Sequence, residues 1–237
     1  MAAVTSHIVA LGGGGFNREP NNPVMDDFIL GLSGKAEPKV CSVPTAQGDS
    51  DAYLLRFYMA FAARRCLPTH LGLFNRTVDD LRGFVLEQDV IYVAGGNTAN
   101  LLAVWRTHGL DTVLREAWEA GVVLCGTSAG ALCWFSAGVT DSFGTMLAPL
   151  HDGLGFLPGS HCPHYDGDTR RRPAYHGFVA DGLPAGVAAD DGCGLHFVGT
   201  ELVEVVTSQQ GAQAYRVAPA GNGDGVTEIP LLARFLG

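Results

Sequence analysis

The segment Gly126–Gly130 gives the clearest chemical signal in the sequence. It reads G-T-S-A-G and matches G-x-S-x-G, the pattern of a nucleophile elbow. An apolar run precedes it and small residues follow, which predicts a strand, a tight turn and then a helix over Ala129–Phe135. Such a turn lifts a serine hydroxyl out of the sheet and points the next amide toward a developing oxyanion. We therefore predict that Ser128 is a nucleophile.

A serine nucleophile needs a base, and the sequence holds eight histidines. Half of them lie in or beside predicted strands and turns, where structural roles are expected: His7, His70, His108 and His196. The others lie downstream of Ser128 in a loop-rich segment: His151, His161, His164 and His176. The base is expected among this second group. The H-x-x-H pair within it lacks a further Cys or Glu ligand set, so no metal site is predicted.

A base also needs an acidic residue that fixes its tautomer. Asp141 follows the elbow, and Asp190–Asp191 stands in a short loop before a predicted strand. Each could equally be a turn or cap aspartate. Sequence spacing does not choose between Asp141 and Asp191.

Apolar strands alternate with helices in the first half of the chain. The predicted strands are His7–Leu11, Lys39–Val43, Val90–Ala94 and Val122–Gly126, and the predicted helices are Met25–Leu32, Ala52–Arg65, Thr98–Thr107 and Leu110–Ala120. This order predicts an α/β fold with a mostly parallel sheet covered by helices on both faces. Ligands bind such sheets beyond the carboxyl ends of the strands, where Gly12–Gly15, Gly95–Asn97 and Ser128 fall.

The second half of the chain has a different texture. Gly138–Pro184 is rich in Gly, Pro, His and Asp, which predicts long functional loops around a helix near Arg172–Ala180. A few short, partly antiparallel strands are then expected near the C-terminus: Gly194–Val198, Leu202–Val206, Gln213–Val217 and the closing segment Ile229–Phe235. Neither an internal repeat nor a linker composition marks a boundary. One domain over residues 1–237 is predicted.

The amino-acid composition excludes some classes of binding partner. The 237 residues include 15 Lys and Arg against 24 Asp and Glu, a formal charge of −9, which argues against nucleic acid or an anionic membrane as the main partner. Apolar stretches fall well short of the roughly 20 residues of a membrane span, and Met1–Gly15 lacks the basic start of a signal peptide. The six cysteines form no CxxC pair, so free thiols and a cytoplasmic location are expected.

Four motifs in order resemble the dipeptidase E (aspartyl dipeptidase) family of serine peptidases. They are V-A-G-G-N-T at Val93–Thr98, G-T-S-A-G-A at Gly126–Ala131, V-T-D at Val139–Asp141 and C-P-H-Y at Cys162–Tyr165. The likeness runs from the first strand to about Gly199. It implies a fold like that of class I glutamine amidotransferases, with serine in place of their cysteine. It also implies hydrolysis of short peptides with an N-terminal aspartate. We expect no cofactor, and a homodimer is one assembly that we consider.

The resemblance assigns roles position by position. Ser128 matches the family nucleophile and His164 the base; Asp141 matches the acidic residue after the elbow, and Asp191 stands where the family usually has Glu. The oxyanion-hole amides match Gly96 and Ala129, and the substrate-binding positions match Asn97 and Arg170, the latter being the arginine that reads the substrate's aspartate. The sequence departs from the family at Asp191, which is one methylene shorter, and at Arg171–Pro173.

Other interpretations remain for individual features. Gly12–Gly15 lacks the G-x-G-x-x-G spacing of a dinucleotide site, so close backbone packing near the rim of the active site is expected instead. A cyanophycinase-like hydrolase shares the elbow. A carboxylesterase of the α/β-hydrolase type would need a histidine near the C-terminus, and none follows His196. A non-catalytic ligand-binding member of the fold is the alternative from another class.

Overall fold

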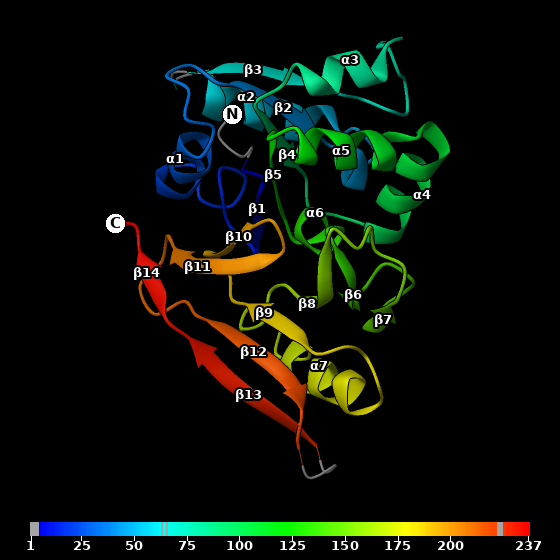
Figure 1. Ribbon diagram of the computed structural model, residues 1–237, viewed down its shortest axis with the longest axis vertical. Helices are drawn as coiled ribbons and strands as arrows, with labels where there is room; N and C mark the ends of the chain where they lie inside the picture. The colour runs from blue at the N-terminus through cyan, green and yellow to red at the C-terminus, as the bar shows by residue number, and fades with distance from the viewer. Residues whose placement is uncertain (1–4, 63, 65, 222–224) are drawn as a thin grey trace.

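Two β-sheets form the framework of the computed structural model, which describes residues 5–62, 64, 66–221 and 225–237 (Figure 1). The larger sheet has the order β14-β11-β10-β1-β5-β4-β2-β3, and the strands from β1 to β3 in this order all run parallel. Its strands are β1 (His7–Leu11), β2 (Lys39–Val43), β3 (Leu67–His70), β4 (Val90–Val93), β5 (Val123–Thr127), β10 (Cys193–Val198), β11 (Glu201–Thr207) and β14 (Ala233–Phe235). The predicted α/β fold with a mostly parallel sheet is confirmed for this part.

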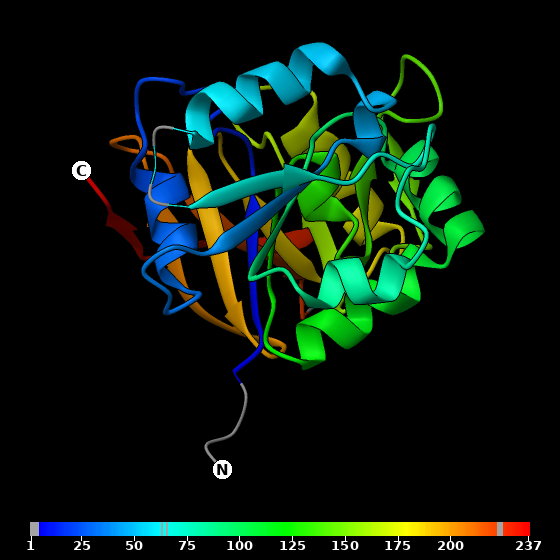
Figure 2. The same cartoon turned by 90° about the horizontal axis from the view of Figure 1, so that it is seen from above.

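Helices pack on both faces of the parallel region (Figure 2). Alternate residues of β1 explain why: Val9 and Leu11 pack with α1 and α2, whereas Ile8 and Ala10 pack in the cluster that includes α3, α4 and α5. The helices are α1 (Val24–Gly31), α2 (Asp51–Phe61), α3 (Leu81–Leu86), α4 (Thr98–His108) and α5 (Leu110–Glu119), with a short 3-10 turn at Thr45–Gln47. The four predicted strands and four predicted helices of this half are present; β3 and α3 were not predicted. Ala63 and Arg65, in the last turn of the helix predicted to Arg65, lie outside the described residues.

The second sheet corrects the prediction for the rest of the chain. It has the order β13-β12-β9-β8-β6-β7 with mixed strand directions, and α7 (Arg171–Ala180) packs against it. Its strands are β6 (Phe135–Thr140), β7 (Ala148–Leu150), β8 (Leu157–Cys162), β9 (Gly186–Ala189), β12 (Ala214–Pro219) and β13 (Val226–Leu231). The prediction of long loops over Gly138–Pro184 was therefore wrong in part, because this range contains β7, β8 and the second half of β6.

The elbow helix is also shorter than predicted. α6 spans Ala129–Leu132, and Phe135 already begins β6. Trp134 and Phe135 are buried, and Phe135 stacks on His161 of β8 with ring centroids 4.7 Å apart. Burying these aromatic rings between the two sheets outweighs continuing the helix, since most helical stability comes from tertiary packing.

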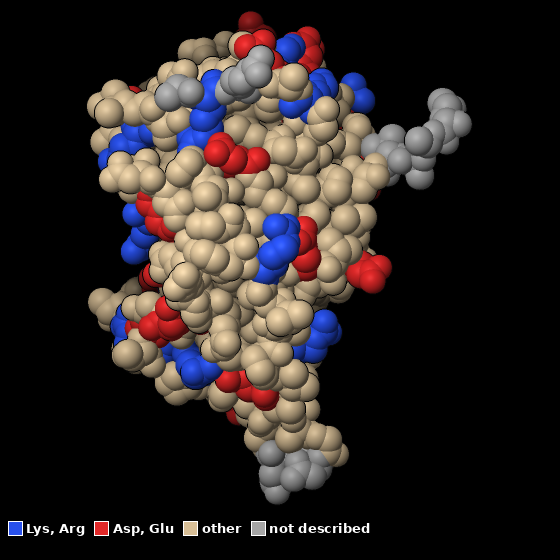
Figure 3. All heavy atoms as spheres, turned by 90° about the vertical axis from the view of Figure 1, so that its left-hand side faces the viewer, with Lys and Arg blue, Asp and Glu red and all other residues tan. Residues whose placement is uncertain are grey.

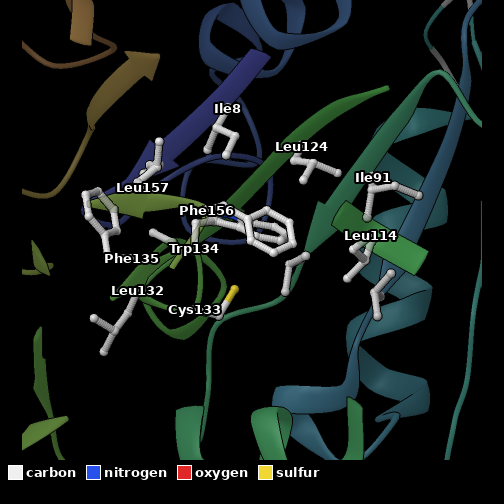
Figure 4. Close-up of a cluster of buried hydrophobic side chains, with 14 of the residues drawn as sticks. Ile8, Ile91, Leu114, Leu124, Leu132, Cys133, Trp134, Phe135, Phe156 and Leu157 are labelled. Carbon is white, nitrogen blue, oxygen red and sulfur yellow. The ribbon is translucent and has the colours of Figure 1, made fainter. Parts of the chain in front are cut away.

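One hydrophobic cluster joins the two sheets. Ile8 and Leu124 of the larger sheet belong to the same cluster as Phe135 and Leu157 of the smaller one, with Trp134 between them (Figure 4). The six cysteines, all in the described part of the chain, are buried and unpaired. Lys, Arg, Asp and Glu are interspersed on the face in Figure 3. None of the described helices has the length and apolar character needed to cross a membrane.

Candidate active site

Ser128 occupies a sharp turn between β5 and α6. Its backbone angles are φ 56° and ψ −112°, and its amide donates a 3.0 Å hydrogen bond to the carbonyl of Leu11 at the end of β1. The flanking glycines are required by close packing: a Cβ at Gly126 would strike the carbonyl oxygen of Gly130, and one at Gly130 would strike that of Val93. This geometry fits the strand–turn–helix context expected of a nucleophile elbow.

His164 follows β8 and is paired with Asp191. The distance from His164 Nδ1 to Asp191 Oδ1 is 2.5 Å. Burial raises the pKa of Asp191, but the hydrogen bond and charge of His164, with contributions from Arg18 and Arg171, bring that pKa below its ordinary value. A charged Asp191 that accepts from Nδ1–H leaves Nε2 of His164 free to accept a proton. This is the arrangement that a general base requires.

Asp141, the other acidic candidate, makes a different contact. Its carboxylate lies 3.5 Å from a terminal nitrogen of Arg171 and makes no contact with His164 of hydrogen-bond or ion-pair length in the described structure. Asp141 is exposed, and it lines the same pocket as Ser128 and His164. In the structure, the histidine therefore contacts Asp191, and Asp141 forms part of the pocket wall.

The glycine run after β1 lies directly against the His164–Asp191 pair. The amide of His164 donates to the carbonyl of Gly12 at 3.0 Å, and the amide of Gly192 donates to the carbonyl of Gly13 at 3.0 Å. A Cβ at Gly13 would overlap Asp191 Oδ1 and lie 2.9 Å from His164 Cε1. The expected close backbone packing near the rim of the site is confirmed.

Ser128, His164 and Asp191 line a pocket of about 350 Å³. Its lining is mostly charged or polar: Arg18, Gly96, Ser128, Asp141, His164, Gly167, Asp168, Arg171 and Asp191. Ser128 Oγ makes no hydrogen bond to His164 in the described structure, although both side chains face this pocket. Catalytic hydrogen bonds are often long before substrate binds and shorten in the complex.

Two amides are available as donors near Ser128: that of Gly96, which lines the pocket, and that of Ala129, the residue after Ser128. The N–H of Gly96 donates no hydrogen bond to the described residues, and Ala129 is the first residue of α6, so its N–H lacks an intrahelical partner. Asn97 is placed differently: it caps α4 by accepting from the Asn100 amide at 2.8 Å, and it donates to the carbonyl of Ser142 at 3.1 Å. Its side chain supports the loop that carries Gly96, and Asn97 is not part of the pocket lining.

The arginines are arranged differently from the sequence-based expectation. Arg170 is 58% exposed, is held by both carboxylate oxygens of Asp168 and does not line the pocket. Arg171 does line it, with its side chain 5% exposed and its Nε buried without a hydrogen-bond partner. Arg18 also lines it, and sequence reasoning missed this residue. Its signal was modest: a single arginine just after a glycine run at the carboxyl end of a strand.

His161 is a core residue. It is fully buried, and its Nδ1 lies 3.0 Å from the carbonyl oxygen of Val187. Burial lowers the pKa of His161 to about 3, so it stays neutral at ordinary pH. Among the described residues, no group of three or more His, Cys, Asp or Glu side chains is arranged to hold a metal ion.

Comparisons with a family model and with known protein sequences all identify peptidases as similar to this chain. The model of peptidase family S51 matches residues 8–205. The uncharacterized peptidase YgaJ of Bacillus subtilis (strain 168) is 52% identical over 231 residues, which cover 97% of this chain and 99% of that protein. A peptidase E of Shewanella denitrificans is 29% identical over 200 residues, 78% of this chain and 83% of that protein.

Solved structures share the fold. The crystal structure of a peptidase from an acI-B1 Actinobacterium matches 98% of this chain and 96% of its own, with a TM-score of 0.75 and 18% identity. A putative peptidase E from Listeria monocytogenes EGD-e matches 86% of this chain and 98% of its own, with a TM-score of 0.63 and 20% identity. The family match includes strands of both sheets and every residue that lines the pocket, and on this basis the chain belongs to peptidase family S51.

Proposed function

We propose that this protein is a serine peptidase that cleaves dipeptides with an N-terminal aspartate, using Ser128, His164 and Asp191. The observation that supports this proposal most directly is the shared pocket: Ser128 at its elbow and the His164–Asp191 pair line the same cavity. A serine, a histidine and a carboxylate in these relations are the parts of an acyl-transfer site.

In the proposed reaction, His164 Nε2 takes the proton of Ser128 as its Oγ attacks the carbonyl carbon of the scissile bond. The negative charge on the carbonyl oxygen is held by the amides of Gly96 and Ala129, and losing one such donor typically costs about 10²–10³ in rate. The C–N bond then breaks as His164 protonates the departing amine. Water, activated by the same histidine, hydrolyses the ester at Ser128 and releases the free acid.

The charges of the pocket wall support the choice of substrate. An N-terminal aspartate presents an ammonium group and a side-chain carboxylate close together, and the wall offers Asp141 and Arg171. We propose that Asp141 binds the ammonium group and that Arg171 binds the carboxylate. Arg171 replaces Arg170 in this role because Arg171 lines the pocket and its buried Nε makes no hydrogen bond, whereas Arg170 is exposed and bound to Asp168.

The experiment is a dipeptide library assay on the wild type and on Ser128→Ala. We expect hydrolysis of Asp-X dipeptides by the wild type and loss of turnover in the variant, with unchanged thermal unfolding because only one small half-buried hydroxyl is removed. His164→Ala should lower kcat by about 10³ or more, as in other triads, and His161→Ala should do much less. Turnover above a few per cent in Ser128→Ala would exclude this serine as the nucleophile.

A further inference from the structure

The turn at residues 15–19, which follows the glycine run, is held by hydrogen bonds to residues about 190 positions later in the chain. The amides of Arg18 and Glu19 donate to the carbonyl of Gly15 at 3.0 and 2.8 Å. The Glu19 carboxylate then accepts hydrogen bonds from Ser208 Oγ and from Gln209 Nε2, both at 3.1 Å. The backbone at Arg18 is therefore held in place beside the active-site pocket.

The side chain of Arg18 has no such ties. It is exposed, lines the pocket and makes no side-chain hydrogen bond or ion pair with any described residue. The other charged groups of the lining are all paired: Arg171 with Asp141 at 3.5 Å, Asp191 with His164 at 2.5 Å, and Asp168 with Arg170 at 2.9 Å. Arg18 is thus the one charged side chain of the described lining that makes no hydrogen bond or ion pair, and it suits an anion.

The position of Arg18 indicates which anion. It comes from the loop that packs against His164 and Asp191, and its charge acts on Asp191. Asp141 and Arg171, by contrast, come from the end of β6 and the start of α7. His164 must reach the departing amine, so the departing residue lies beside this histidine. In a dipeptide, the free carboxylate is two bonds from that nitrogen, a distance of roughly 2.5 Å.

Building on the function proposed above, we propose that Arg18 binds the free α-carboxylate of the departing residue. The site then recognises both ends of its substrate: the N-terminal residue at Asp141 and Arg171, and the C-terminal carboxylate at Arg18. A longer peptide has an amide at this position and cannot form the ion pair. Arg18 is in this way a specificity-determining residue for dipeptides.

The test compares kcat/KM for Asp-Leu and Asp-Leu amide, which differ only in the C-terminal charge. We expect the wild type to favour Asp-Leu, and Arg18→Ala to lower its kcat/KM by about 10- to 100-fold, the usual range for a lost charge-assisted hydrogen bond. The loss should appear in KM, with the amide substrate unchanged and with partial recovery in Arg18→Lys. Arg82→Ala is the matched control, because Arg82 forms a surface ion pair with Glu116 and its removal changes the net charge equally.

Three outcomes would overturn the assignment. Equal losses on both substrates would mean that Arg18 acts through the His164–Asp191 pair. An unchanged preference for Asp-Leu over its amide, with a reduced preference for Asp-Leu over Asn-Leu, would mean that Arg18 reads the aspartate side chain. Failure of the wild type on every dipeptide would overturn the proposed function itself, and this result is distinct from turnover with an unaltered substrate ratio.

Discussion

Ser128 and His164 are held by consecutive carbonyls at the end of β1. The amide of Ser128 donates to Leu11 and the amide of His164 donates to Gly12, both at 3.0 Å. Both residues have a positive φ angle, 56° for Ser128 and 53° for His164. Non-glycine residues adopt such angles at an energetic cost and keep them only where the surrounding structure enforces them. The strand end thus fixes the proposed nucleophile and base relative to each other.

Gly13→Ala should impair the site while leaving the rest of the fold in place. The added methyl group overlaps Asp191 Oδ1 and approaches His164 Cε1, so the pair must separate. We expect kcat to fall by about 10² or more, since misplacement by about 1 Å can cost this much. Gly31→Ala is the control, because a Cβ there meets no atom within 4 Å. Equal kcat values for the two variants would contradict this prediction.

Substitutions at Asp191 and Asp141, two aspartates of the pocket, should change different kinetic parameters. Asp191→Asn keeps the shape but removes the charge that orients His164, and we expect kcat to fall by about 10³–10⁴. Asp141→Asn should mainly raise KM, because Asp141 contacts Arg171 rather than the histidine. Steady-state kinetics on Asp-Leu measure both effects. A larger kcat loss in Asp141→Asn would transfer the orienting role to Asp141.

Arg171 and Arg170 provide a similarly matched pair. Arg171→Gln should raise KM for Asp-Leu much more than for Asn-Leu, by about tenfold or more for a lost guanidinium–carboxylate pair. Arg170→Gln should change both substrates little, because Arg170 is 58% exposed and bound to Asp168. The ratio of kcat/KM values for the two substrates is the measurement. If Arg170→Gln alone lowers this ratio, the role expected from the family motif belongs to Arg170.

The pH dependence of stability should report on Asp26. This carboxyl is fully buried beside Arg64, Tyr92 and the amide of Phe16. Burial raises its pKa from 3.8 to about 6, so the folded state binds the proton more tightly than the unfolded state does. The resulting stabilisation is complete below pH 3.8 and is lost as the pH rises through 6.

Asp26→Asn should remove this contribution. The free energy of unfolding of the wild type, relative to the variant, should be about 1 kcal/mol larger at pH 5 than at pH 7.5. Urea denaturation at the two pH values measures it. Asp27→Asn is the control, since Asp27 is an exposed neighbour that also pairs with Arg64. A difference that grows toward pH 7.5 would reverse the sign assigned here.

Sequence reasoning succeeded where a local pattern determines the structure. The strands β1, β2, β4 and β5 are apolar runs buried by helices, and the elbow at Ser128 lies between β5 and α6 as its motif predicts. The strand β8 was missed because its residues are LPGSHC, with Gly, Pro and polar side chains. Its buried Ser160 is satisfied by Tyr175 and by the carbonyl of Pro184, contacts that no local pattern contains.

The features of the site that the sequence left undecided depend on contacts between residues far apart in the chain. His164 contacts Asp191 and not Asp141, and this contact joins residues that are 27 positions apart in the described chain. The position of Arg18 depends on a turn anchored at Ser208 and Gln209, about 190 residues along the chain. The roles of these residues, and the single domain over residues 1–237, stay predictions.

The division of the site between two sheets has a consequence for folding. Ser128 follows β5 of the larger sheet, whereas His164 follows β8 of the smaller one. The proposed site needs residues from both sheets, so we expect enzymatic activity only after the two sheets have docked. Contacts between residues far apart in the chain form slowly. During refolding, hydrolysis should therefore return later than the far-ultraviolet circular dichroism signal of secondary structure. The recovery of hydrolysis would then report when the two sheets dock.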